Sequence, residues 1–142
     1  MNRTVDKIPN RTQKLLAFVS QDFEEDLCSI LEEHIAGLAS SRTWSLGPPK
    51  YVNDQSDSPT LGGVLEIYSA IPKGSLSLEL DRTNYQEVVS FVDSMSQLSA
   101  DYELAIEFEL DGTFVGSIED GTMDTSLRDG LLDEWKKYLE SQ

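Results

Sequence analysis

The sequence predicts an α+β fold in which an antiparallel sheet of two hairpins packs against helices, in the order α-β-β-α-β-β-α. Apolar residues recur at three- and four-residue steps in three segments, which is the spacing of an amphipathic helix. Between these segments, apolar and polar residues alternate, as is typical of half-buried strands. An Asp-Gly pair also stands between two alternating runs and indicates a two-residue hairpin turn. Hairpins covered by helices on one face make a two-layer domain.

Residues 11–37 are predicted to be helical. Asn10 or Thr12 can cap the start of this helix, and Gly37 can end it in a left-handed conformation. The segment is longer than the usual globular helix of about 10–14 residues. Two short helices therefore fit equally well, with a capping box at Asp22 and Glu25. The apolar stripe consists of Leu16, Val19, Phe23, Leu27, Ile30 or Leu31, His34 and Leu38.

Residues 40–63 are rich in Pro, Gly, Ser and Asp, and are predicted to form a long loop within one domain spanning residues 1–142. The consecutive Pro48 and Pro49 cannot donate hydrogen bonds to a sheet. At most a short edge strand is expected there, around Tyr51.

The first hairpin is predicted from residues 64–70, "VLEIYSA", and residues 75–81, "SLSLELD", joined by the turn "IPKG". In the second of these runs, leucines alternate with serines and acids, so one face would be apolar. Residues 83–99 then return to helical spacing, and Thr83 with Gln86 forms a capping box.

The second hairpin is predicted around Asp111-Gly112. The run "YELAIEFEL" precedes the turn and places apolar residues on one face and glutamates on the other, and "TFVGSI" returns as its partner strand. A final helix is predicted to begin at Asp124 or Thr125 and to run through Leu139.

Composition and charge narrow the possible functions. The chain carries 26 acidic against 11 basic residues, a formal net charge of −15, which repels nucleic acid and anionic membranes and favours basic proteins. Acidity can also serve solubility alone. No apolar run approaches the roughly 20 residues that span a bilayer, and the polar N-terminus lacks the apolar core of a secretory signal. With Cys28 as the only cysteine, nothing indicates an oxidising compartment, so a cytoplasmic location is expected.

Few residues in the sequence fit catalysis or metal binding. A calcium loop beginning at Asp111 would have threonine or valine at three required ligand positions, and zinc needs clusters of Cys and His. Cys28 and His34 lie in the most regular helical stripe, so core positions are favoured over a nucleophile–base pair. No catalytic residue, metal or cofactor is therefore predicted. A small enzyme remains a competing hypothesis, and it would require His34 in a pocket with a carboxylate.

The remaining acids point to protein binding. A sheet covered by helices on one side leaves its other side in water, and that side is predicted to be acidic. Like charges across strands destabilise a sheet by some tenths of a kcal/mol, a cost that a cationic partner would remove. Trp44, Tyr51 and Tyr68 are candidate aromatic anchors for such a partner. The predicted partner-binding residues are Glu79, Glu103, Glu107 and Glu109 on the sheet, with Glu119, Asp120 and Asp124 at the adjoining strand-to-helix corner.

The closing block, "FELDGTFVGSIEDGTMDTSLRDGLLDEWKKYL", resembles the C-terminal part of small acidic immunity proteins of bacterial polymorphic-toxin and contact-dependent growth inhibition systems. The resemblance lies in a strand, an Asp-Gly turn and the succession "VGSIEDG" and "GLLDEW". It implies a non-enzymatic protein that binds the C-terminal domain of a cognate toxin, a basic nuclease or nucleic-acid deaminase, and blocks its active site or substrate surface. The alternative is a DNA-mimicking inhibitor or acidic adaptor that binds several nucleic-acid-binding proteins.

Overall fold

The computed structural model describes residues 12–20, 24–54, 60–69 and 76–142, and in this part of the chain the fold is α+β, as predicted. It has three helices and a six-stranded antiparallel sheet, in the order β-α-β-β-α-β-β-β-α. The predicted order α-β-β-α-β-β-α is wrong in two places, because a strand precedes the first helix and a third strand follows the second hairpin. The strands are β1 (Thr12–Val19), β2 (Lys50–Asp54), β3 (Thr60–Tyr68), β4 (Ala105–Leu110), β5 (Thr113–Glu119) and β6 (Thr122–Met123). The helices are α1 (Glu25–Ser40), α2 (Leu78–Tyr102) and α3 (Glu134–Glu140), the last preceded by the π-helical segment η2 (Ser126–Asp133).

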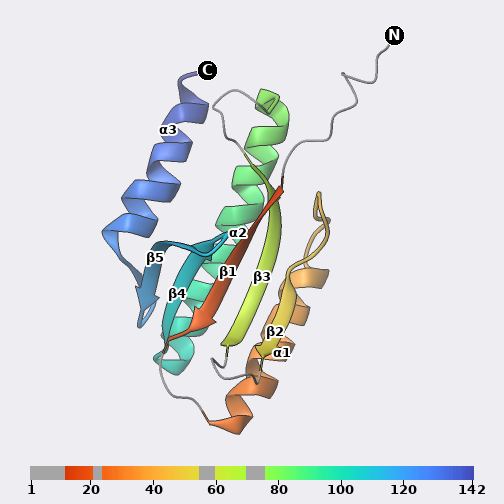
Figure 1. Cartoon of the computed structure of the whole chain (residues 1–142), viewed down its shortest axis with the longest axis vertical. Helices are drawn as coiled ribbons and strands as arrows, with labels where there is room; N and C mark the ends of the chain where they lie inside the picture. Colours follow the sequence, from red (N-terminus) through yellow and green to blue (C-terminus); the bar gives the residue numbers. More distant parts are fainter. Residues whose placement is uncertain (1–11, 21–23, 55–59, 70–75) are drawn as a thin grey trace.

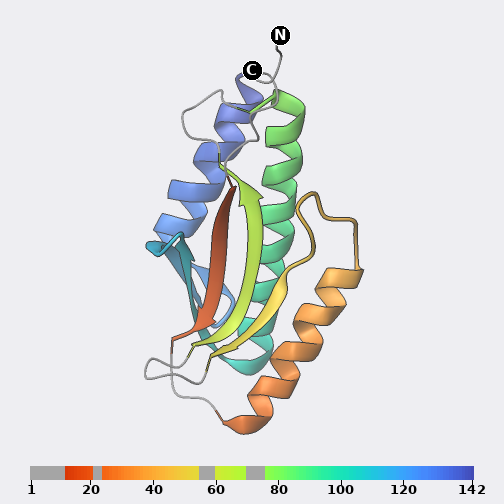
Figure 2. The same ribbon diagram turned by 45° about the vertical axis from the view of Figure 1, so that its right-hand side comes forward.

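The sheet has the strand order β2-β3-β1-β4-β5-β6, so the first strand of the chain lies near its middle. All the helices lie against one side of the sheet, with α1 near β2 and the long α2 running behind the central strands (Figures 1 and 2). The core fills the space between these two layers. Phe91 of α2 meets Phe108 of β4 edge to face there, with ring centroids 6.3 Å apart and both side chains fully buried. No helix of the described residues lies on the other side of the sheet.

The predicted helix over residues 11–37 is wrong in its first half, because residues 12–19 form β1. Leu15, Ala17 and Val19 are buried against the helices, at the period of two that defines a strand. The continuous apolar run "LLAFV" fits either a helical stripe or a strand in the middle of a sheet. The second half of the prediction is confirmed by α1, although the proposed cap at Asp22 lies outside the described residues.

The predicted loop over residues 40–63 is partly wrong, because it contains β2 and the first residues of β3. The short strand expected around Tyr51 is confirmed: β2 is the edge strand of the sheet and follows Pro49 directly. Gly62 of β3 allows the tight approach of β3 to β1, since a Cβ atom there would lie 1.8 Å from the carbonyl oxygen of Ala17.

The strand predicted over residues 75–81 is also wrong, because α2 begins at Leu78. Ser77 caps this helix, and its side chain accepts a hydrogen bond of 3.2 Å from the amide of Leu80. The alternating leucines of this segment therefore belong to a capped first helical turn. The helix predicted over residues 83–99 is confirmed as part of α2, and the predicted turn "IPKG" lies outside the described residues.

The hairpin at Asp111-Gly112 is confirmed. Both turn residues have positive φ, 50° and 86°, as a type I′ turn requires. A second Asp-Gly pair, Asp120-Gly121, joins β5 to the short β6 in the same way, with φ values of 49° and 80°. The final helix begins where predicted, but as the π-helical segment η2 before it continues as α3.

Candidate protein-binding face

The uncovered side of the sheet, called the open face below, is defined by two rows of side chains that cross five strands. Residues paired directly across antiparallel strands point to the same side of a sheet, so the register identifies each row. The first row is Lys50, Val64, Leu16, Glu109 and Phe114, and the second row is Val52, Gly62, Phe18, Glu107 and Ser117.

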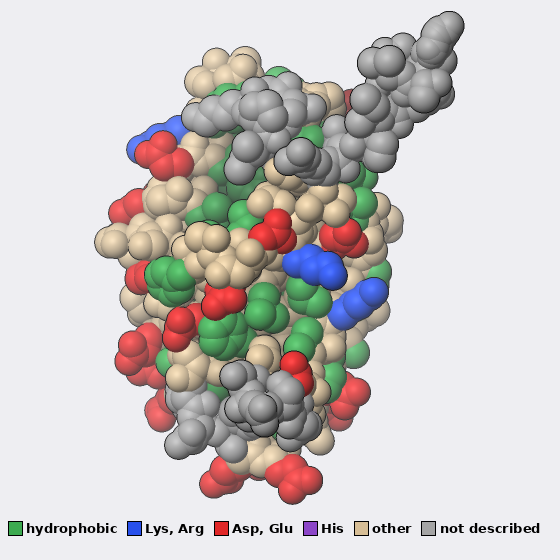
Figure 3. Space-filling view, in the orientation of Figure 1, with side chains coloured by type: hydrophobic (Ala, Val, Ile, Leu, Met, Phe, Trp, Pro, Cys, Tyr) green, Lys and Arg blue, Asp and Glu red, His purple; other side chains and the backbone are tan. Residues whose placement is uncertain are grey.

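The middle of the open face is apolar. Phe114 is 51% exposed and the other apolar side chains of the two rows are half-buried, and none of them belongs to the hydrophobic core. Figure 3 shows hydrophobic side chains gathered in the centre of this side of the molecule, with charged side chains around them. A contiguous exposed apolar patch on a protein surface often marks an interaction site. We call this set the outer apolar cluster: Leu16, Phe18, Val52, Val64 and Phe114.

Charged side chains surround the outer apolar cluster unevenly. Glu107 and Glu109 lie on β4, next to Phe18 and Leu16 of β1. Lys50 lies on the edge strand β2, and Lys14 lies on the central strand β1, paired with Glu66 of β3. None of the carboxylates of Glu66, Glu107 and Glu109 forms a salt bridge with a cation of the described residues. The β4 half of the open face therefore presents uncompensated negative charge beside apolar surface.

Two of the predicted sheet-face acids, Glu107 and Glu109, lie on the open face as expected. The other two do not. Glu79 is in the first turn of α2, where its negative charge faces the positive end of the helix dipole. Glu103 is the left-handed C-cap of α2, with φ of 53°, two residues before β4 begins. The prediction that Glu79 and Glu103 lie on the sheet is therefore wrong, because these residues lie at the two ends of α2.

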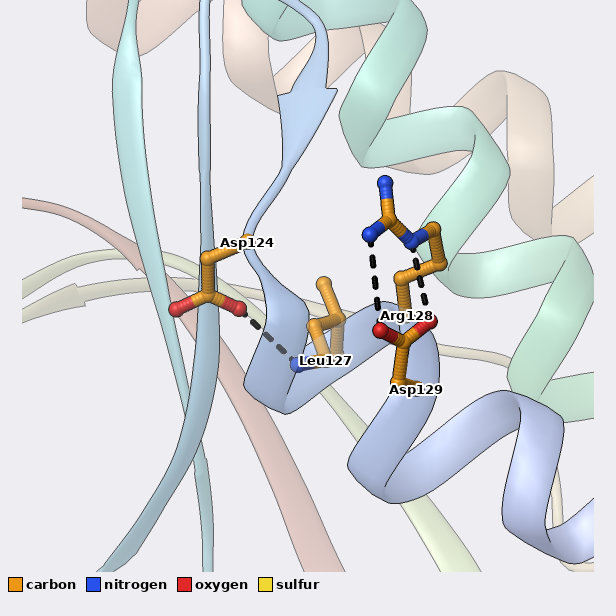
Figure 4. Close-up of polar contacts among 4 residues, drawn as sticks. All are labelled: Asp124, Leu127, Arg128 and Asp129. Carbon is orange, nitrogen blue, oxygen red and sulfur yellow. Dashed lines mark hydrogen bonds and ion pairs between the residues drawn. The ribbon is translucent and has the colours of Figure 1, made fainter.

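The three corner acids occupy different environments. Glu119 is the last residue of β5 and is exposed. It is paired with Ala105, on the side of the open face, and Asp120 follows it in the turn. The carboxylate of Asp124 is already engaged, because it accepts hydrogen bonds from the amide of Leu127 at 2.8 Å and from the hydroxyl of Ser117 at 3.1 Å. Asp124 thus caps η2, as Figure 4 shows.

The proposed aromatic anchors lie mainly elsewhere. Trp44 is in the core; its indole N–H donates to the carbonyl of Ala39 at 3.1 Å. Tyr51 packs against the core beside Cys28. Burial is the main cause that raises the pKa of its hydroxyl, and the nearby thiol of Cys28 is the next. Only Tyr68 is on the side of the open face, at its end, paired with Thr12. Besides Tyr68, the open face carries the aromatic residues Phe18 and Phe114, and the unbroken apolar run of β1 is the sequence signal for Phe18.

Among the described residues, the hydrogen-bond partner of His34 is Ser94 of α2. The Nε2 atom of His34 lies 2.9 Å from the carbonyl oxygen of Ser94 and 2.8 Å from the hydroxyl of the same residue. A carbonyl oxygen can only accept, so Nε2 carries the proton and has no lone pair with which to activate the hydroxyl. Within the described ranges, no three His, Cys, Asp or Glu side chains are grouped to hold a metal ion.

Two buried carboxylates hold the fold together. Asp81 accepts a hydrogen bond of 2.8 Å from the indole N–H of Trp135, which ties α3 to the start of α2. Glu87 accepts from both the amide and the hydroxyl of Ser45, at 3.0 and 2.6 Å, and so fixes the segment before β2. These contacts satisfy the buried acids and account for their positions without a ligand.

Comparison of the chain with protein-family models, with curated proteins and with solved structures finds no match. Among the described residues, no helix combines the length and the apolar character needed to cross a bilayer. The described part of the chain is thus an α+β protein whose open face combines an apolar centre with the carboxylates of Glu107 and Glu109.

Proposed function

We propose that the chain is an immunity-type inhibitor that binds a basic toxin domain through the open face and neutralises it by stoichiometric complex formation. The observation that carries the proposal is the outer apolar cluster, which lies beside the carboxylates of Glu107 and Glu109 in a chain of net charge −15. An apolar centre with a charged rim is the usual anatomy of a protein–protein interface. The resemblance of residues 108–139 to small acidic immunity proteins agrees with this function.

Charge favours a basic partner over a second copy of the chain. Two copies that met through their open faces would bring together molecules of net charge −15, with Glu107 and Glu109 in each contact. A basic partner would instead associate rapidly, because opposed potentials raise association rates to about 10⁸ M⁻¹s⁻¹ or more. Apolar contacts at the centre of the interface would then slow dissociation.

A nucleic-acid-directed toxin fits this chemistry. A nuclease or deaminase holds the phosphates of its substrate with Lys and Arg side chains, and an acidic inhibitor competes for the same groups. Inhibition would follow from occupation of the substrate surface, with no chemical step. The inhibitor would act in the compartment where the toxin acts, which for such toxins is the cytoplasm.

Co-expression tests this function directly. The toxin domain encoded immediately upstream should arrest growth when expressed with an empty vector, and the present chain should restore growth and co-purify with it at one-to-one stoichiometry. A variant with Phe18→Lys and Phe114→Lys should remain folded and should no longer protect the cells from the toxin. Absence of both rescue and complex would contradict the proposal. Equal binding to several unrelated DNA-binding proteins would instead support a DNA-mimicking inhibitor or acidic adaptor.

A further inference from the structure

We propose that the open face recognises arginine side chains of its partner, through two glutamate–phenylalanine pairs built by the strand register. In one row, Glu107 of β4 stands directly opposite Phe18 of β1, and in the next row Glu109 stands opposite Phe114 of β5. Each carboxylate therefore has an aromatic ring as its cross-strand neighbour. This inference rests on the proposed binding function of the same face and names the chemistry of the partner.

A carboxylate beside a ring matches arginine better than lysine. Directly opposed residues in an antiparallel sheet have Cβ atoms about 4.5–5.5 Å apart, so one group can contact both. The planar guanidinium can form two parallel hydrogen bonds with a carboxylate while its face lies on an aromatic ring. The ammonium of lysine is compact and strongly hydrated, and it cannot make both contacts in this way. The chain shows a guanidinium on an aromatic ring in another place, with Arg42 stacked 5.2 Å from the centre of Trp44.

The two pairs also set a spacing for the partner. Glu107 and Glu109 are two residues apart on one strand, which corresponds to about 7 Å along its axis. Arginines four residues apart on a helix lie about 5–6 Å from each other at Cβ, and their long side chains readily span the difference. Leu16 lies between Glu109 and Val64 in one row, so an apolar side chain of the partner would contact it.

The lysines of the open face give the complex a direction. Lys50 lies in the same row as Glu109 but three strands away, on the edge strand β2. Lys14 lies next to Leu16 along β1, and its backbone amide donates to the carboxylate of Asp111 at 2.8 Å. A cationic partner segment is therefore attracted to the carboxylates of β4 and repelled by Lys50 at the β2 edge of the sheet.

The test uses two synthetic peptides and the full chain. Each is an alanine-based helix of about 16 residues, long enough to form in water, with a central leucine and two cations four residues apart. One carries arginines and the other carries lysines. Binding is followed by two-dimensional NMR of the isotope-labelled chain, and we expect shifts at residues 16–18, 107–109 and 114, with about three- to fivefold tighter binding of the arginine peptide.

Two variants separate specific recognition from general charge. Glu107→Gln with Glu109→Gln should weaken binding of the arginine peptide about tenfold, whereas Glu32→Gln with Glu33→Gln, exposed on α1, removes the same charge and should weaken it about twofold at most. Phe18→Leu with Phe114→Leu keeps the face apolar and removes the rings. It should abolish the preference for arginine and leave the affinity for the lysine peptide unchanged.

Several results would overturn the inference. These are equal binding of the two peptides, no binding of either, equal loss in the two glutamine variants, or shifts confined to the helices. A dimer of the free chain that dissociates on Phe18→Leu with Phe114→Leu would make a second copy the occupant and would also overturn it. If the upstream toxin domain is nevertheless neutralised by the unmodified chain, the proposed function stands and only arginine recognition fails. If neutralisation also fails, both proposals are lost.

Discussion

Gly116 of β5 provides the sharpest test of how the helices pack on the sheet. Its φ is +152°, and η2 passes so close that a Cβ atom at this position would lie 2.4 Å from the Cβ of Leu127 and 2.7 Å from its Cα and amide nitrogen. Leu127 is fully buried and its amide is held by Asp124, so it has little room to move. Gly116→Ala is therefore expected to force the layers apart.

The cost of Gly116→Ala can be worked out from two contributions. Holding an alanine at this φ costs on the order of 1–3 kcal/mol, and overpacking against Leu127 adds about 1–3 kcal/mol. We expect a total of about 2–6 kcal/mol in the free energy of unfolding. For a chain of this length, the unfolding entropy is about 0.3 kcal/mol per degree, so the melting temperature should fall by about 7–20 °C.

Thermal unfolding followed by circular dichroism measures this change, and Gly37→Ala is the matched control. Gly37 lies in α1 with nothing within 4 Å of an added Cβ atom and without a positive φ. The same substitution there should raise the melting temperature by about 2–3 °C, since alanine is favoured in a helix by about 0.8–1.0 kcal/mol. A melting temperature of Gly116→Ala within about 2 °C of the parent would refute this account of the packing.

Three further predictions concern polar contacts of the fold. Trp135→Phe removes the hydrogen bond to the buried Asp81 and should cost about 1.5–3 kcal/mol in urea unfolding; Asp81→Asn combined with it should cost less than the sum of the single changes. Asp124→Ala removes the cap of η2 and should cost about 1 kcal/mol, while Asp124→Asn should retain most of the stability. Burial raises the pKa of the Asp93 carboxyl above its ordinary value of 3.8, so this group favours folding fully below pH 3.8 and progressively less as pH rises through the folded-state pKa. Asp93→Asn should thus raise the melting temperature relative to the parent at pH 7, and the difference should shrink toward pH 3; an equal difference at both values would contradict the argument.

The sequence predicted best those elements whose signals are local. Asp111-Gly112 required a type I′ turn, and the hairpin around it is present. The stripe of α2 and the start of the last helix also depend on neighbours within a few residues. For the same reason, the position of Glu107 and Glu109 on the open face followed from simple alternation along β4.

Elements decided by distant contacts were predicted wrongly. The run "LLAFV" of β1 is apolar on both faces, since one face joins the core and the other carries Leu16 and Phe18. Pairing with residues about 50 and 90 positions later in the chain determines that it is a strand. The error carried into the candidate site, since Leu16 and Phe18 were assigned to a helix and the open face was expected to be polar. Glu79 was misplaced because the Ser77 cap outweighs the alternation of the leucines around it.

The central place of β1 also has a consequence for the way the protein forms. β1 leaves the ribosome before its pairing partners β3 and β4, and until they emerge neither of its hydrogen-bonding edges is paired. Contacts between residues so far apart in sequence close slowly and expose apolar segments to aggregation. β1 is also the strand that joins the β2–β3 half of the sheet to the β4–β6 half. A nascent chain therefore completes its sheet only when the later strands β3 and β4 have paired with the two edges of β1. A chain that lacks the residues through 19 would form two separate sheets, β2–β3 and β4–β6, in place of one.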